Sequence, residues 1–329
     1  MDTGFNRSGV KANEFEMSPW EKWDKGESQL RNRIGVLMVL LLLGIMGRLD
    51  AATSDSVPSP VLTVPDQVGM GQPFLVRLTS DIELKQVSMQ WMGRKISPSV
   101  SVWKSRHVAL AMLGTDVLTI NPGSHALEVQ AMVGGKKIRW VRGITISPKS
   151  FPRQELTLPS KMVTPPESVM DRIKKEREIT TSAKNKWSDQ RMWQLPFHWP
   201  VPGETTSSYG LRRVLNKKPK DPHRGLDFNA ASGSPVEAVA PGRVILAEDH
   251  YYAGNSLYLD HGNGVISLYF HLKKFLVAQG DLVKKGQAIG LVGSSGRATG
   301  PHLHLSISVQ GQLVDPVPLF KGTPDELLN

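Results

Sequence analysis

Five side chains that could bind or activate a metal ion occur in three short segments toward the C-terminal end of the chain. His223 and Asp227 are four residues apart, His302 and His304 are two residues apart, and His271 lies between the two pairs. Histidine and carboxylate groups are ligands that zinc takes in hydrolytic sites, where three protein ligands leave one position for water. The chain has no cysteine, which excludes disulfides and thiolate metal sites. These segments therefore predict a zinc site made from His and Asp.

The spacing of His302 and His304 indicates different roles for the two histidines. Alternate residues of a strand point to the same side but lie roughly 6.5 to 7 Å apart, too far for both to be equal ligands of one ion. One of them can bind the metal while the other stands beside it. Two neutral imidazoles near a water molecule on the metal can remove its proton and stabilise the developing oxyanion, because their pKa lies near working pH.

Each of the three segments alternates polar and apolar residues, the period typical of a half-buried β-strand. In the first strand Asp227 stands between Leu226 and Phe228. The expected polar faces of the other two strands consist of Ser267, Tyr269 and His271, and of His302, His304, Ser306 and Ser308. Scattered surface histidines are the alternative interpretation. The joint occurrence of the motifs on amphipathic strands favours a sheet whose open polar face is the site.

The remaining histidines lack this context. His198, His250 and His261 lie in expected loops, and we predict that they face solvent. His107 and His125 have no neighbours of ligand type, so they are expected at ordinary surface or turn positions.

The pattern along the chain predicts a mainly β protein with two folded regions. Short strand-like runs separated by Gly-rich turns cover residues 58–148, which we expect to form a β-sandwich module. Residues 149–199 form a short helical linker in this interpretation. Residues 200–320 form a β-rich domain with an open antiparallel sheet groove. A length of 329 residues suits about two such domains.

The linker carries helix signals. Residues 164–167, Thr-Pro-Pro-Glu, have the spacing of a capping box and precede a charged helix expected over 168–180. Its apolar stripe is thin, so a solvated connector is the plain interpretation and a lid over the site is the alternative. Trp187, Trp193, Phe197 and Trp199 are expected to pack at the entrance of the second domain.

The N-terminal segment, residues 1–52, has the features of an export signal. Residues 34–46 are apolar residues and Gly, and this run is too short to cross roughly 30 Å of hydrocarbon, which needs about 20 residues. A signal peptide fits better, with Ala51 and Ala52 placed for cleavage, while an uncleaved signal-anchor and a start at Met17 stay open. We therefore expect an exported protein of the periplasm or cell envelope, with an inner-membrane anchor at residues 34–46 as the variant.

A formal net charge of +10 favours anionic partners in general. Nucleic acid is disfavoured, because the sequence has no zinc finger, no aromatic RNA-binding pattern and no basic recognition helix. A basic run close to His223 consists of Arg212, Arg213, Lys217, Lys218, Lys220 and Arg224. We expect a solvated loop there, with electrostatic attraction of anionic ligands as a hypothesis.

The motifs His223-x-x-x-Asp227, Tyr269-x-His271 and His302-x-His304 resemble those of the M23 zinc metallopeptidases, the lysostaphin-type or LytM-domain family. Four flanking segments are also similar to the family: residues 208–212, 233–236, 280–287 and 295–301. The resemblance covers about residues 200–318. The β-sandwich before it is similar, more loosely, to the immunoglobulin-like modules that precede this domain in some exported members.

The resemblance implies a zinc endopeptidase that cuts peptide bonds of bacterial peptidoglycan. By it, His223, Asp227 and His304 bind one zinc ion, and His271 and His302 flank the catalytic water. Which of the two is the base is left open. Stem-peptide cross-links between D-alanine and diaminopimelate are favoured over pentaglycine, because no glycine-bridge-binding module is visible.

The alternatives to a zinc endopeptidase are a regulator of other hydrolases, a carrier domain and a structural zinc site. Some family members have lost ligands and only activate or regulate other cell-wall hydrolases, although no motif position is missing here. The 280–287 segment also occurs in lipoyl and biotinyl carrier barrels, but the chain has no Met-Lys-Met context for attachment. A structural zinc site would close the fourth position with a protein ligand.

Overall fold

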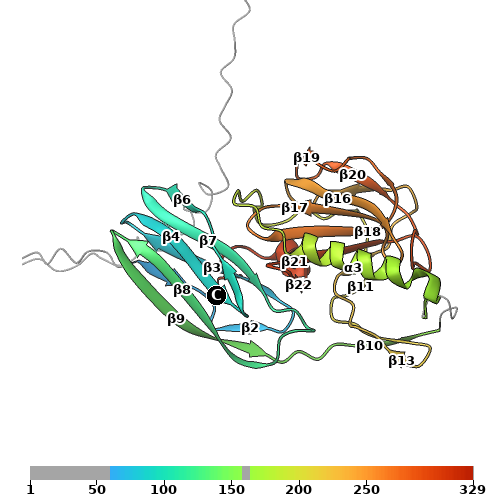
Figure 1. The fold of residues 1–329 in the computed structure, drawn as a ribbon, viewed down its shortest axis with the longest axis horizontal. Helices are drawn as coiled ribbons and strands as arrows, with labels where there is room; N and C mark the ends of the chain where they lie inside the picture. Colours follow the sequence, from blue (N-terminus) through green and yellow to red (C-terminus); the bar gives the residue numbers. More distant parts are fainter. Residues whose placement is uncertain (1–59, 158–163, 329) are drawn as a thin grey trace, which may run out of the picture. The chain divides into compact units, whose positions relative to one another are not determined.

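The fold is mainly β, as the sequence predicts. The structure is a computed structural model that describes residues 60–157 and 164–328, all within one compact unit, Ser56–Asn329 (Figure 1). Over these two ranges no helix has the length and apolar character needed to cross a membrane. The predicted export segment at residues 34–46 lies outside the described residues.

Residues 61–147 form a β-sandwich of two sheets. The first sheet has the order β1 (Val61–Thr63), β3 (Pro73–Ser80), β7 (Arg106–Gly114) and β6 (Val100–Trp103). The second has the order β2 (Gln67–Gly69), β9 (Lys136–Ser147), β8 (Gly123–Val133), β4 (Leu84–Trp91) and β5 (Arg94–Ile96). Both sheets contribute to one apolar core, in which Trp91 is fully buried and packs edge-to-face on Phe74. The immunoglobulin-like resemblance stays a prediction.

Residues 205–314 form the second domain around one large sheet. Its main order is β11 (Thr205–Ser207), β14 (Leu226–Phe228), β21 (Leu303–Val309), β18 (Val265–Phe275), β17 (Gly254–Asp260), β16 (Gly242–His250) and β19 (Leu282–Val283). Three further strands join it: β15 (Pro235–Glu237), β20 (Ala288–Val292) and β22 (Gln312–Val314). A short helix, α4 (Val317–Lys321), follows the sheet.

The linker is not purely helical. Its first part forms β10 (Arg153–Leu156), which pairs in parallel with β12 (Arg212–Leu215), and β12 pairs with β13 (Lys218–Pro219). Farther along, the linker contains a 3-10 turn, η1 (Glu167–Val169), and the helix α3 (Met170–Lys184). The capping-box prediction is wrong, because neither element has a side-chain cap hydrogen bond.

Helix α3 packs on the second domain (Figure 1). Ile179 and Ala183 contact an apolar cluster of the sheet that includes the fully buried Tyr258, and the hydroxyls of Thr180 and Tyr258 lie 3.1 Å apart. Near the start of α3, Arg172 donates to Asp249 Oδ2 at 2.9 Å. The helix therefore lies on the surface, as its thin apolar stripe predicts, with none of its residues buried, and these contacts fix it against the sheet.

The register of three neighbouring strands brings predicted site residues side by side. In the antiparallel β14–β21 pair Asp227 lies opposite His304, and in the antiparallel β18–β21 pair Phe270 lies opposite His304. Directly opposed residues share a face of the sheet. Asp227, His304 and Phe270 therefore form one row, while Leu303 and Leu305 point to the other face and are fully buried.

Strand β18 departs from regular alternation at His271. The pairing with β17 shifts by one residue between Tyr269 and Leu272, and His271 has a φ of 62°. An extra residue in one strand is a β-bulge, which re-aims the side chains beside it. The predicted polar face of this strand is wrong for Ser267 and Tyr269, which are fully buried on the opposite face. The bulge turns His271 to the face that carries Phe270.

A buried carboxylate joins the sandwich to the segment that carries His223. Asp116 is 3 % exposed and accepts hydrogen bonds from the backbone N–H groups of Leu118 and Leu313 at 3.0 and 3.1 Å. It also accepts one from the Arg224 guanidinium at 3.2 Å. Arg224 directly follows His223, so the sandwich helps to fix the backbone at a predicted ligand.

His250 and His261 are buried, so the prediction that they face solvent is wrong. His261 donates one ring N–H to the Pro241 carbonyl at 2.7 Å, and its other ring nitrogen lies 2.7 Å from the Ser267 hydroxyl. The Ser267 hydroxyl in turn lies 3.1 Å from that of Tyr269. This polar chain occupies the face of the sheet opposite to the site.

Burial of His261 makes the stability of the fold pH-dependent. Burial lowers the pKa of His261 from 6.5 to about 4, against the opposing effects of its bond to Pro241 and of nearby Asp260. The unfolded chain binds a proton on His261 below about pH 6.5, whereas the folded chain binds it only below about pH 4. The free energy of unfolding should therefore fall across this window, by at most about 3 kcal/mol. Urea denaturation at pH 7 and pH 4.5 should show a smaller pH dependence in His261→Gln; an unchanged dependence would contradict this account.

Loss of the Asp116 charge should destabilise the fold strongly. Asp116→Asn leaves the Arg224 guanidinium without its buried anion, and we expect the free energy of unfolding to fall by about 3 kcal/mol in urea denaturation. Glu128→Gln is the matched control, because Glu128 also pairs with an arginine, Arg139, in the same sandwich, but these two side chains are 24 % and 59 % exposed. The control should leave the midpoint nearly unchanged. Equal effects of the two substitutions on the free energy of unfolding would contradict a larger contribution from the buried Asp116–Arg224 pair.

Candidate metal centre

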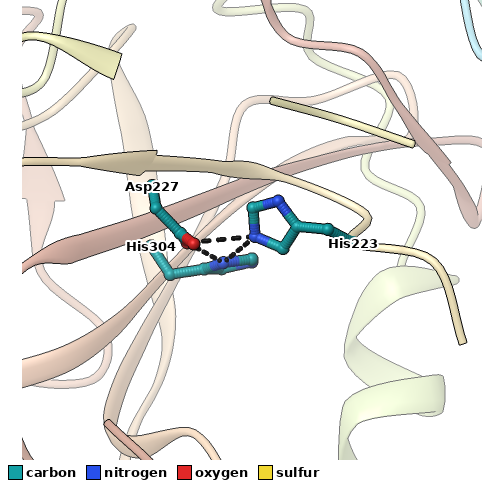
Figure 2. Close-up of side chains that lie close together, drawn as sticks. All are labelled: His223, Asp227 and His304. Carbon is teal, nitrogen blue, oxygen red and sulfur yellow. Dashed lines mark hydrogen bonds and ion pairs between the residues drawn. The ribbon is translucent and has the colours of Figure 1, made fainter. Parts of the chain in front are cut away.

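Three ligand atoms meet at one point of the second domain. His223 Nε2 lies 3.0 Å from Asp227 Oδ1 and 2.9 Å from His304 Nδ1, and His304 Nδ1 lies 2.8 Å from Asp227 Oδ1. Figure 2 shows the three side chains pointing toward one another. They come from the segment before β14, from β14 itself and from β21. Of the described residues, these three form the one group of His, Cys, Asp and Glu side chains placed to hold a metal ion.

The outer hydrogen bonds of both histidines leave lone pairs at this point. His223 Nδ1 donates to the Ser208 carbonyl at 3.0 Å, so the neutral ring has no proton on Nε2. His304 Nε2 lies 2.8 Å from the Ser306 hydroxyl, which itself donates to the Arg224 carbonyl, so the proton of neutral His304 is on Nε2. Two bare ring nitrogens and a carboxylate oxygen therefore converge, a donor set that fits zinc.

Asp227 is held as a carboxylate. Burial alone raises the pKa of Asp227. The contacts of Oδ1 with His223 and His304, which become hydrogen bonds when either ring takes up a proton at this point, outweigh burial and lower this pKa far below its ordinary range. Its second oxygen, Oδ2, accepts from the Arg213 guanidinium at 2.7 Å. One oxygen thus faces the two histidines while the other is fixed by a cation, which sets the orientation of the group.

His271 and His302 stand beside the three ligand atoms. Their rings lie 4.7 Å apart between centroids, and the His271 ring lies 6.3 Å from that of His304. His271 Nδ1 donates to the Ser295 carbonyl at 2.8 Å, and His302 Nδ1 donates to the Gly300 carbonyl at 2.9 Å. Each neutral ring therefore keeps a lone pair on Nε2. Burial, aided by His304, lowers the pKa of His271 to about 3.

These residues line an open cavity of about 580 Å³. Phe270 stacks on the His304 ring with centroids 5.1 Å apart and planes 4° apart, which fixes the ring from the side opposite to Asp227. Helix α3 contributes no residue to the cavity wall, so the structure gives no support to the lid alternative.

Several residues that hold the ligands were missed or misplaced by sequence reasoning. Arg213 and Arg224 belong to the basic run predicted to be solvated, but they pair with Asp227 and Asp116 and their side chains are only 28 % and 26 % exposed. Phe270 lies between Tyr269 and His271, which were predicted on the polar face, so alternation placed it on the apolar face. The position of Ser306 two residues after His304 was the one available signal for its role.

Fold and site together define a hydrolase-type metal centre on an antiparallel sheet. Residues 221–316 match the model of peptidase family M23, so the chain contains a domain of this family. The matched range includes the three clustered ligands and both flanking histidines.

Two named relatives are similar to part of this chain. The chain is 38 % identical over 148 residues to the peptidoglycan DD-endopeptidase ShyA of Vibrio cholerae, a match that covers 43 % of this chain and 34 % of ShyA. It is 47 % identical over 94 residues to ShyB of the same organism, which covers 29 % of this chain and 22 % of ShyB. The chain thus spans about a third or less of the length of these relatives.

A solved structure extends the similarity beyond the peptidase domain. A crystal structure from Pseudomonas aeruginosa assigned to peptidase M23 superposes with a TM-score of 0.56 at 27 % identity. The superposition covers 74 % of this chain and 94 % of that chain. This coverage exceeds residues 221–316, so elements before the peptidase domain are also shared with that structure.

Separate substitutions of His304 and His302 should have different effects on the zinc content of the protein. His304→Ala removes one of the three converging ligand atoms, so the purified protein should lose its zinc. His302→Ala leaves all three ligand atoms in place and should keep about one zinc per chain. The metal content of the two variants is compared by mass spectrometry. Circular dichroism checks that both are folded. Retention of full zinc by folded His304→Ala would exclude this ligand set.

Proposed function

We propose that the chain is a zinc-dependent endopeptidase that hydrolyses peptide cross-links of bacterial peptidoglycan. The observation that carries the proposal is the convergence of His223, Asp227 and His304 beside two histidines with bare ring nitrogens in one cavity. The DD-endopeptidase names of ShyA and ShyB support peptidoglycan as the substrate.

Each site residue has a distinct part in the proposed reaction. His223, Asp227 and His304 hold the zinc ion, which when bound supplies a Lewis acid that polarises a carbonyl and acidifies water toward a pKa of about 7. His271 and His302 each present Nε2, because Nδ1 donates to a backbone carbonyl. One of the two, as a neutral ring, takes a proton from the attacking water on Nε2. The other acts as an imidazolium: its Nε2–H stabilises the oxyanion and then passes to the leaving amine.

The bond that we propose is the D-alanyl–diaminopimelate cross-link. Two relatives are named DD-endopeptidases, which fits a bond between two D-centres. The sandwich and linker contain no element that sequence analysis identifies with binding of a glycine bridge. We further propose export to the periplasm or cell envelope, since the substrate lies outside the cytoplasm.

Digestion of purified sacculi tests enzyme class and bond together. Zinc-loaded wild-type protein should release muropeptides cut at the cross-link, identified by mass, and the His304→Ala protein should release none. Zinc content is measured on the same samples. A zinc-loaded wild type that leaves sacculi intact would instead favour a non-lytic regulator of another hydrolase.

Replacement of His271 should separate metal binding from turnover. His271→Ala removes a ring that lies beside the ligands without being one of them, so zinc content should stay near one per chain. Hydrolysis should fall by roughly a hundredfold or more, the range typical of a lost general acid or base. Hydrolysis at the wild-type rate by zinc-loaded His271→Ala would remove this histidine from the mechanism.

A further inference from the structure

The cavity of the metal centre has a cationic wall. Its charged lining residues are Arg213, Lys220, Asp221, Arg224, Asp227 and Arg297. Arg213 pairs with Asp227, and Arg224 pairs with Asp116, so both of these cations have defined partners within the fold. Four cations against two anions make the cavity attractive to an anionic ligand before any metal charge is added.

Arg297 differs from the other cations of the cavity in how it is held. Its guanidinium lies over the ring of Tyr252, 4.4 Å from the ring centroid, and both residues line the cavity. The backbone N–H of Arg297 donates to the Tyr252 carbonyl at 2.8 Å. Cation–π attraction holds a guanidinium over an aromatic ring, and the planar N–H donors of the group suit a carboxylate.

The loops that carry this pair are the loops that orient the flanking histidines. Next to Tyr252, the Ala253 carbonyl accepts from the backbone N–H of His271 at 2.9 Å. On the other loop, the Ser295 and Gly300 carbonyls fix the rings of His271 and His302. The Arg297–Tyr252 pair therefore belongs to the same local framework as the groups that handle protons.

The loop that contains Gly296 also packs closely against the backbone at Gly254. A Cβ on Gly296 would lie 2.3 Å from the Gly254 backbone nitrogen, and Gly296 has a φ of 69°. Ser295 Oγ accepts from the Asn255 N–H at 2.9 Å and donates to the Leu272 carbonyl at 2.8 Å. Such a framework holds a binding group in place before the ligand arrives, which lowers the entropic cost of binding.

We propose that Arg297, supported by the Tyr252 ring, binds a carboxylate on the leaving-group side of the scissile peptide bond. The inference rests on the proposed function and adds a specificity-determining residue to it. In a D-alanyl–diaminopimelate bond the scissile nitrogen is attached to a carbon that bears a free carboxylate. A histidine that protonates this nitrogen lies close to that carboxylate, and the Arg297 loop holds both flanking histidines.

Paired peptides test the proposal. One cross-linked stem peptide carries the free carboxylate beside the scissile nitrogen, and its partner carries a carboxamide there. The dissociation constants of both are measured by calorimetry on zinc-loaded His271→Ala, alone and combined with Arg297→Gln, Arg297→Lys or Lys274→Gln. The values of kcat/KM are measured on the full-length chain and on the three single variants.

A charge-assisted contact to carboxylate predicts that the carboxylate peptide binds at least about tenfold more tightly than the carboxamide. Arg297→Gln should abolish this preference, and Arg297→Lys should keep part of it, because the charge remains and the planar fork is lost. Lys274 is exposed and lies outside the cavity wall, so Lys274→Gln should keep the full preference.

Equal affinity for the two peptides, or an Arg297→Gln protein with the original preference, would overturn the subsite. A protein that cuts neither peptide but still prefers the carboxylate would overturn the proposed reaction and leave the subsite standing. Weaker binding of both peptides to the same degree in Arg297→Gln would show that the arginine only supports the loop, and this also overturns the proposal.

Discussion

Two imidazole nitrogens and a carboxylate oxygen lie within 3.0 Å of one another with their lone pairs directed at the same point. Such an arrangement is repulsive unless a cation occupies it or a proton is added. The surrounding bonds prevent the histidines from turning away: the Ser208 carbonyl holds His223, Ser306 and Phe270 hold His304, and Arg213 holds Asp227. The fold thus maintains an unfavourable contact that metal binding converts into a favourable one.

The sandwich takes part in this arrangement through a few buried polar contacts. Asp116 reaches Arg224, whose carbonyl accepts from the Ser306 hydroxyl beside His304. The Tyr209 hydroxyl accepts from the Val117 N–H and donates to the Leu313 carbonyl. A charged group at a buried interface is costly to separate from its partners. The sandwich is therefore a structural support of the second domain as well as a folded region of its own.

The fold class and the grouping of the five candidate residues around one cavity could be predicted from the sequence, because both depend on local patterns. Alternation marked the strands, and spacing marked which side chains share a face. The predictions were wrong where contacts between residues far apart in the sequence determine the burial or the partner of a side chain. Burial of His261 depends on Pro241 and Ser267, and the role of Arg224 depends on Asp116, 108 residues away. The face of Tyr269 was misassigned because no Gly or Pro marks the bulge at His271.

The bulge in β18 makes the site sensitive to the number of residues in a strand and not only to their identity. Phe270 and His271 are neighbours in sequence, yet both serve the same face, because one extra residue interrupts the pairing with β17. In a strand without the bulge, regular alternation would place His271 on the same face as Tyr269, which is buried in the core. The number of residues between Tyr269 and Leu272 therefore decides, together with the histidine itself, whether this strand contributes a side chain to the site.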